Sequence, residues 1–151
     1  MNESKKPEEL HKHETTLYVN DYILIQKHIH MTPPKLLYVV TGGPERSTQA
    51  MSALMLATTA ASAGNKAVVF FHLDGVKSVT AENVMKTKLE GFPGLLETVE
   101  HALSLDVQLY SSEESLMIHG LTSRDMMRGV EVVGSAKLND LMLSSDAVLS
   151  L

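Results

Sequence analysis

The chain of 151 residues contains no cysteine and no tryptophan. Without cysteine it can form neither a disulfide nor a thiolate metal site, and it offers no thiol for covalent chemistry. Aromatic residues make up only 5% of the sequence, which is too few for the stacking surfaces that bind single-stranded nucleic acid. These absences exclude thiol catalysis by this chain and argue against a nucleic-acid partner.

Positive charge and long apolar segments are also scarce. The net charge is −5, whereas binding to nucleic-acid phosphates needs concentrated lysine and arginine. No apolar run approaches the roughly 20 residues that span a bilayer, and the first nine residues hold no apolar segment of the signal-peptide type. We therefore expect a cytoplasmic protein without a membrane partner, large enough for one domain with a real core.

The first 34 residues differ in composition from the rest of the chain. Residues 1–14 are polar and charged, which predicts a flexible tail. Residues 15–34 carry apolar side chains at alternating positions and end at a Pro-Pro pair, a pattern that predicts a strand-like arm or hairpin. Because this arm has no core of its own, we expect it to pair with a sheet edge, for example that of a neighbouring subunit.

Residues 35–151 alternate between short apolar runs and longer segments with helical periodicity. Continuous apolar runs predict strands covered on both faces, here at 35–40, 67–71, 106–110, 130–133 and 147–151. Apolar residues three and four apart predict helices at 45–63, 93–105, 112–118 and 135–143, with shorter helical stretches near 76, 84 and 122–127. The alternation predicts a three-layer α/β/α sandwich around a mainly parallel five-stranded sheet.

Ligands of such sheets bind beyond the carboxyl ends of the strands. The residues that follow the expected strands therefore form the predicted pocket, which consists of Thr41, Gly42, Gly43, His72, Asp74, Ser111, Ser112 and Gly134. The two glycines before a helix suit either an anion cradle or an ordinary tight turn. Neither a phosphate-loop spacing nor a dinucleotide fingerprint is present, so no cofactor is expected.

Two of these positions could carry chemistry of their own. His72 and Asp74 suit an acid–base pair, since a nearby carboxylate favours the charged imidazole, but Asp-Gly is also common turn chemistry. Ser112 could be a nucleophile at a helix start, yet the sequence shows no partner base and no Gly-x-Ser-x-Gly elbow. The alternative for Ser112 is a helix cap, with two acidic residues following in the first turn.

Paired histidines suggest a different kind of site. His11 and His13, and likewise His28 and His30, are two residues apart, which would place each pair on one face of an extended segment. Four imidazoles could bind zinc or copper, but no carboxylate or cysteine at a fixed spacing supports such a site. The simpler interpretation is a set of solvated histidines, and these four residues are kept as weak metal candidates.

Four segments, taken in order, carry a resemblance to a known family. They are 37–45 (LYVVTGGPE), 66–76 (KAVVFFHLDGV), 107–115 (VQLYSSEES) and 130–136 (VEVVGSA). Together they resemble the DsrE/DsrF-like family of small sulfur-relay proteins over about three quarters of the chain, from residue 35 onward. The third segment is similar to the family's strand that leads into C-x-x-S, but Ser112 stands where several members carry persulfide sulfur on a cysteine.

The resemblance implies the fold described above, a pocket at Ser112 and a homo-oligomer, whether dimer, trimer or hexamer. It does not imply sulfur transfer, because a hydroxyl cannot carry a persulfide. The leading hypothesis is therefore a non-catalytic subunit that binds a small ligand or a partner protein in sulfur relay, with enzymatic activity left open. The alternatives are a sulfur-transfer component that acts with a cysteine-bearing partner and a metal-responsive protein that uses the N-terminal histidines.

Overall fold

A five-stranded parallel sheet forms the centre of the computed structural model, which describes residues 32–151. The strands run in the order β4-β3-β2-β1-β5. Their bounds are β1 (Lys35–Val40), β2 (Lys66–Phe71), β3 (Gln108–Ser112), β4 (Val130–Val133) and β5 (Ala147–Ser150). The predicted α/β fold is confirmed. The expected tail and nearly all of the expected arm fall on residues 1–31, outside the described residues.

Helices alternate with these strands as the periodicity predicts. They are α2 (Ser47–Ser62), α3 (Gly75–Ser78), α4 (Ala81–Lys86), α5 (Leu95–Ser104), α6 (Glu113–Ile118) and α7 (Ser135–Ser144), with 3-10 turns at Pro44–Arg46 and Ser123–Asp125. Gly64 ends α2 with a φ of 84°, and its N–H donates to the Ala61 carbonyl at 2.9 Å. This left-handed residue is the helix stop that glycine supplies at no steric cost.

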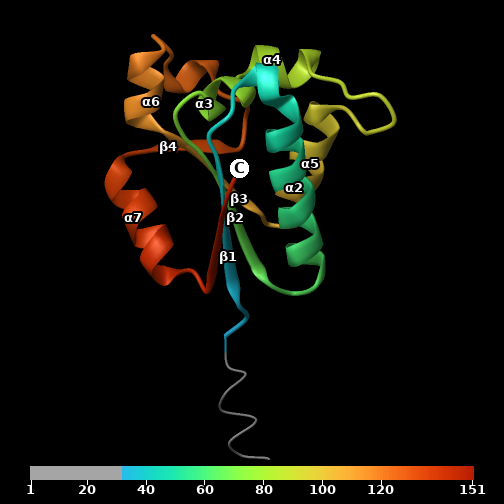
Figure 1. The fold of residues 1–151 in the computed structure, drawn as a ribbon, viewed down its shortest axis with the longest axis vertical. Helices are drawn as coiled ribbons and strands as arrows, with labels where there is room; N and C mark the ends of the chain where they lie inside the picture. Colours follow the sequence, from blue (N-terminus) through green and yellow to red (C-terminus); the bar gives the residue numbers. More distant parts are fainter. Residues whose placement is uncertain (1–31) are drawn as a thin grey trace, which may run out of the picture. The chain divides into compact units, whose positions relative to one another are not determined.

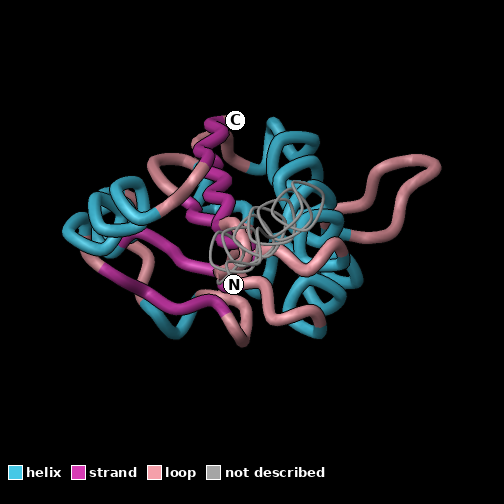
Figure 2. The backbone as a smooth tube through the Cα atoms, turned by 90° about the horizontal axis from the view of Figure 1, so that it is seen from below, coloured by secondary structure: helices cyan, strands magenta, loops and turns pink. Residues whose placement is uncertain are grey.

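The two faces of the sheet are covered unequally. Helices α2 and α5 lie on one face, and α7 lies on the other (Figures 1 and 2). The larger apolar core lies on the α2 side, where alanines at 50, 53 and 57 are fully buried and let the helix approach the strands closely. The smaller core faces α7 and contains Leu37, Val39, Val68, Phe70, Tyr110 and Leu141.

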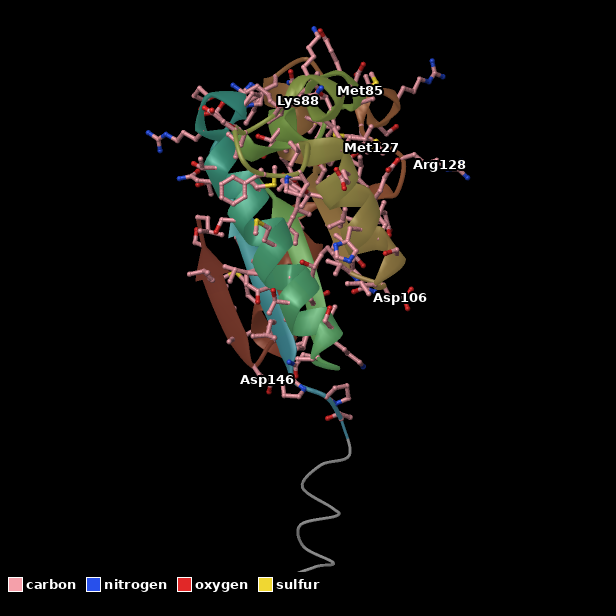
Figure 3. All side chains as sticks on the ribbon, turned by 90° about the vertical axis from the view of Figure 1, so that its right-hand side faces the viewer. Met85, Lys88, Asp106, Met127, Arg128 and Asp146 are labelled. Atoms are coloured by element: carbon pink, nitrogen blue, oxygen red, sulfur yellow. The ribbon has the colours of Figure 1, made fainter. Side chains whose placement is uncertain are left out.

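Because the strands are parallel, their carboxyl ends meet at one end of the sheet. The short helices α3, α4 and α6 gather at that end (Figure 1). Asp106 and Asp146 lie near the opposite end (Figure 3), where the Asp146 carboxylate accepts the Lys35 backbone N–H at 2.7 Å. The fold thus brings the segments that follow β1, β2, β3 and β4 to a common edge.

Strand β3 begins and ends two residues later than the predicted strand at 106–110. Ser111 and Ser112 continue the strand because they pair in register with Val132 and Val133 of β4. Ladder hydrogen bonds, rather than side-chain hydrophobicity, therefore set this end of the strand. Within residues 32–151, no helix has both the length and the apolar character needed to cross a bilayer.

Candidate functional site

Alternation along the strands places three of the predicted site residues on the α7 side of the sheet. Val39, Phe70 and Tyr110 are neighbours in register and belong to the core that faces α7. Thr41, His72 and Ser112 follow them by two positions and therefore continue the same face. The rings of Phe70 and His72 meet edge to face, with their centroids 6.3 Å apart.

Ser112 is the N-cap of α6. Its Oγ accepts the Ser115 backbone N–H at 3.3 Å and donates its proton to Glu114 Oε2 at 3.1 Å. The residue is 1% exposed. The capping interpretation is confirmed, and the hydroxyl has no proton left for a ligand or for nucleophilic attack in this arrangement.

Glu114 ties the start of α6 to the start of α7. Its Oε1 accepts the Ser135 backbone N–H at 2.8 Å, next to Gly134, the N-cap of α7. This bond, followed by hydrogen bonds from the Glu114 backbone and from the side chains of Ser135 and Ser112, lowers the pKa of Glu114 from 4.5 to about 2. Sequence reasoning noticed an acid in this turn but did not assign it to the site.

His72 contacts Ser115, a residue that the sequence analysis did not assign to the site. Ser115 Oγ lies 3.2 Å from His72 Nδ1 and accepts the Leu73 backbone N–H at 2.9 Å. Ser115 is 1% exposed, so its hydroxyl serves these internal contacts. The sequence did contain one signal for Ser115. It follows Ser112 by three residues, which places both serines at the start of the helix.

Asp74 does not pair with His72, so the acid–base pair, one of the two interpretations of these residues, is not formed. The Asp74 carboxylate instead lies 2.7 Å from Lys77 Nζ and 3.3 Å from His119 Nε2. The hydrogen bond and the positive charge of Lys77 lower the pKa of Asp74. The physical reason is Leu73, whose left-handed backbone (φ 51°) breaks the strand geometry between His72 and Asp74.

The glycine turn after β1 is closed by internal contacts. The Gly43 N–H donates to the Glu45 carboxylate at 3.2 Å, and the Gly42 carbonyl accepts the Ser78 hydroxyl at 3.2 Å. A Cβ on Gly42 would lie 1.8 Å from Gln49 Oε1, so the Gln49 side chain would have to move to accept any other residue there. Thr41 donates its hydroxyl to the Leu151 carbonyl at 2.8 Å. These contacts favour the turn interpretation over an anion cradle.

Ser111 faces away from this group. It follows Leu109 by two positions and lies in register with Val132, both of which belong to the α2-side core. Its side chain is fully buried, and its hydroxyl has no hydrogen-bond partner among residues 32–151. The structure thus brings His72, Ser112 and Gly134 together through Ser115 and Glu114, and it separates Ser111 and Asp74 from them.

Metal binding by the described residues has no structural support. Within residues 32–151 no group of three His, Asp or Glu side chains is arranged to hold an ion. The weak metal candidates His11, His13, His28 and His30 lie outside the described residues.

Comparisons with known proteins agree with this architecture. Residues 34–151 match the family model described as the DsrE/DsrF-like family, so the chain belongs to that family. At the family level, membership supports a function related to sulfur relay. The chain contains no cysteine.

Two individual proteins are similar to the chain. The ychN protein of E. coli has a crystal structure that superposes with a TM-score of 0.67 at 20% identity, covering 78% of this chain and 99% of that one. The likeness shows the shared fold. The uncharacterized protein MJ0760 of Methanocaldococcus jannaschii is 26% identical over 101 residues, which cover 67% of this chain and 37% of that protein. The match therefore spans well under half the length of this relative.

Proposed function

We propose that this chain is a non-catalytic DsrE-like protein of the cytoplasm, which binds a small ligand or a partner at the carboxyl edge of its sheet. The observation that carries the proposal is the state of Ser112. Its hydroxyl is engaged with Ser115 and Glu114, and its side chain is 1% exposed. The resemblance to the family places it where several members have a cysteine. A serine in this state neither holds a persulfide nor attacks a donor.

Polar groups near this edge still support binding. His72 lies beside Phe70 on the α7 side of the sheet, and Lys137 Nζ lies 5.3 Å from the centre of the Tyr110 ring on the same side. Glu114 already has its hydrogen bonds within the protein. His72 is therefore the group that we assign to ligand contact, in preference to Ser112.

Intact-mass spectrometry tests the non-catalytic part of the proposal. The wild-type chain is incubated with a persulfide donor or with thiosulfate and then desalted, and a cysteine-containing peptide in the same tube confirms that the persulfide donor is active. The expected result is an unchanged protein mass with a sulfur-loaded peptide. A stable gain of one sulfur atom by the protein would overturn the proposal.

A second candidate function is a subunit that acts beside a cysteine-bearing partner. Exposed apolar side chains on α7 and β5 favour assembly, because isolated exposed leucines are common but grouped ones mark contact surfaces. They are Met142, Leu143, Val148 and Leu149. Co-purification of a cysteine-containing DsrE-like chain would favour this function, and a homogeneous assembly of this chain alone would favour the homo-oligomer.

A further inference from the structure

The hydroxyl of Ser115 has a single proton, and the contacts around it decide where that proton goes. Ser115 Oγ accepts the Leu73 N–H at 2.9 Å and faces His72 Nδ1 at 3.2 Å. Within residues 32–151, Ser115 Oγ makes no third hydrogen bond. If Nδ1 is unprotonated, the hydroxyl donates to it and both Ser115 contacts are satisfied.

The opposite tautomer of His72 is unfavourable. A proton on Nδ1 would have to be accepted by Ser115 Oγ, which already accepts the Leu73 N–H. The Ser115 proton would then have no acceptor in a residue that is 1% exposed. An unmade hydrogen bond in a buried site is destabilising. The network therefore places the ring proton on Nε2.

The second ring nitrogen is available to a ligand. His72 Nε2 has no hydrogen-bond partner within residues 32–151, and it is not one of the buried polar atoms that lack a partner. His72 is partly exposed, and Nε2 is the ring nitrogen that remains for contact with a ligand. A protonated Nε2 donates a hydrogen bond, whereas a metal ion would need the lone pair that this tautomer has removed.

We propose that Ser115 is a positioning residue that fixes His72 as an Nε2–H donor, so that the site takes a small anion and does not take a metal cation. The inference rests on the proposed binding function at this edge and names its ligand class. Lys137, on the same side of the sheet, adds a positive charge, and both carboxylate oxygens of Glu114 accept hydrogen bonds within the protein.

Nitrogen-15 NMR of the full chain tests the tautomer without any ligand. Long-range proton–nitrogen correlations at a pH where histidine is neutral distinguish a protonated ring nitrogen from an unprotonated one, and His72→Gln identifies the signals. We expect the proton on Nε2 in the wild type, a mixture of tautomers in Ser115→Ala, and recovery of the wild-type pattern in Ser115→Thr. A proton on Nδ1 in the wild type, or an unchanged spectrum in Ser115→Ala, would overturn the role of Ser115.

Titration with thiosulfate, sulfate and Zn²⁺ tests the ligand class on the same samples. We expect an anion to shift the His72 Nε2 signal. In Ser115→Ala the affinity should fall in proportion to the fraction of His72 that leaves the Nε2–H tautomer, which is about twofold for an equal mixture. Gln at position 72 places an amide N–H near the Nε2 position and should retain binding better than His72→Asn. Zn²⁺ binding at Nε2 without any anion response would overturn the ligand class. That result would leave the mass-spectrometric test of the proposed function unaffected.

Discussion

Ser111 and Ser112 are adjacent and similarly buried, yet they differ completely in hydrogen bonding. Ser112 caps α6 and binds Glu114, whereas the Ser111 hydroxyl has no partner among residues 32–151. Their side chains point to opposite faces because the strand alternates at each residue. The pair allows one serine to serve as the control for the other.

Alanine at each position should therefore have a different effect on stability. We expect Ser112→Ala to lower the free energy of unfolding by about 1 kcal/mol, since it removes a helix cap. Ser111→Ala removes a buried hydroxyl without a partner and should be neutral or stabilising. Urea denaturation of both variants measures the difference. Equal losses from the two substitutions would contradict the assignment of Ser112 as a cap.

Leu73 lies in the loop between β2 and α3, and its backbone conformation is strained. A residue with a Cβ in the left-handed region is destabilised by roughly 1–2 kcal/mol, and Leu73 has a φ of 51° with an exposed side chain. We expect Leu73→Gly to be more stable than Leu73→Ala by about 1 kcal/mol, because only glycine removes the strain. Both variants remove the side chain beyond Cβ, so the difference in stability between them measures the strain of the backbone conformation. A more stable alanine variant would contradict this account.

At the scale of elements, α6 is held at both ends. Ser112 and Glu114 attach its start to β3 and α7, and His119 at its end lies 3.3 Å from the Asp74 carboxylate. Ser115 attaches its middle to His72 and Leu73. A helix of six residues is too short to be stable alone, so these attachments fix its position at the candidate site.

The attachment through Glu114 predicts a pH dependence of stability. Its pKa is lowered from 4.5 to about 2 in the folded protein, so the ionised carboxylate stabilises the fold above pH 4.5. This contribution is lost as the pH falls from 4.5 toward 2. We expect Glu114→Gln to be less stable than the wild type at neutral pH and to lose that deficit across this interval.

Urea unfolding at several pH values measures the effect. Glu113→Gln is the matched control, because Glu113 is an exposed acid in the same turn and should show a much smaller change. A deficit of Glu114→Gln that stays constant down to pH 2 would contradict the assigned interaction.

The elements could be predicted from the sequence because each strand that the core covers is a continuous apolar run. The site could be predicted only in part. The strand ends indicated His72, Ser112 and Gly134, which the structure brings together. The left-handed Leu73 turns the chain before Asp74, and no residue type in the sequence signals that conformation. Ser115 and Glu114 were missed as site residues because their importance comes from contacts between separate elements.

At the scale of the molecule, the unequal covering of the sheet supports assembly. Leu143 of α7 is 87% exposed, and Val148 and Leu149 of the edge strand β5 are also exposed. We expect a homo-oligomer in which this surface is covered, so that Leu143→Glu lowers the mass measured by light scattering. Met85→Glu is the control, since Met85 is also apolar and exposed but lies on α4. A wild-type monomer, or an unchanged mass of the Leu143→Glu assembly, would contradict this expectation.

The central claim is that Ser112, which the resemblance places at the family's cysteine, is a structural cap. The most direct measurement is the rate at which Ser112→Cys, which introduces the only thiol of the variant, reacts with a thiol reagent in the native and the unfolded protein. Exposed Ser62→Cys is the control. We predict that the native Ser112→Cys variant reacts far more slowly than its unfolded form, while the control reacts at similar rates in both. Fast native reaction at position 112, followed by stable loading with persulfide sulfur, would contradict the account.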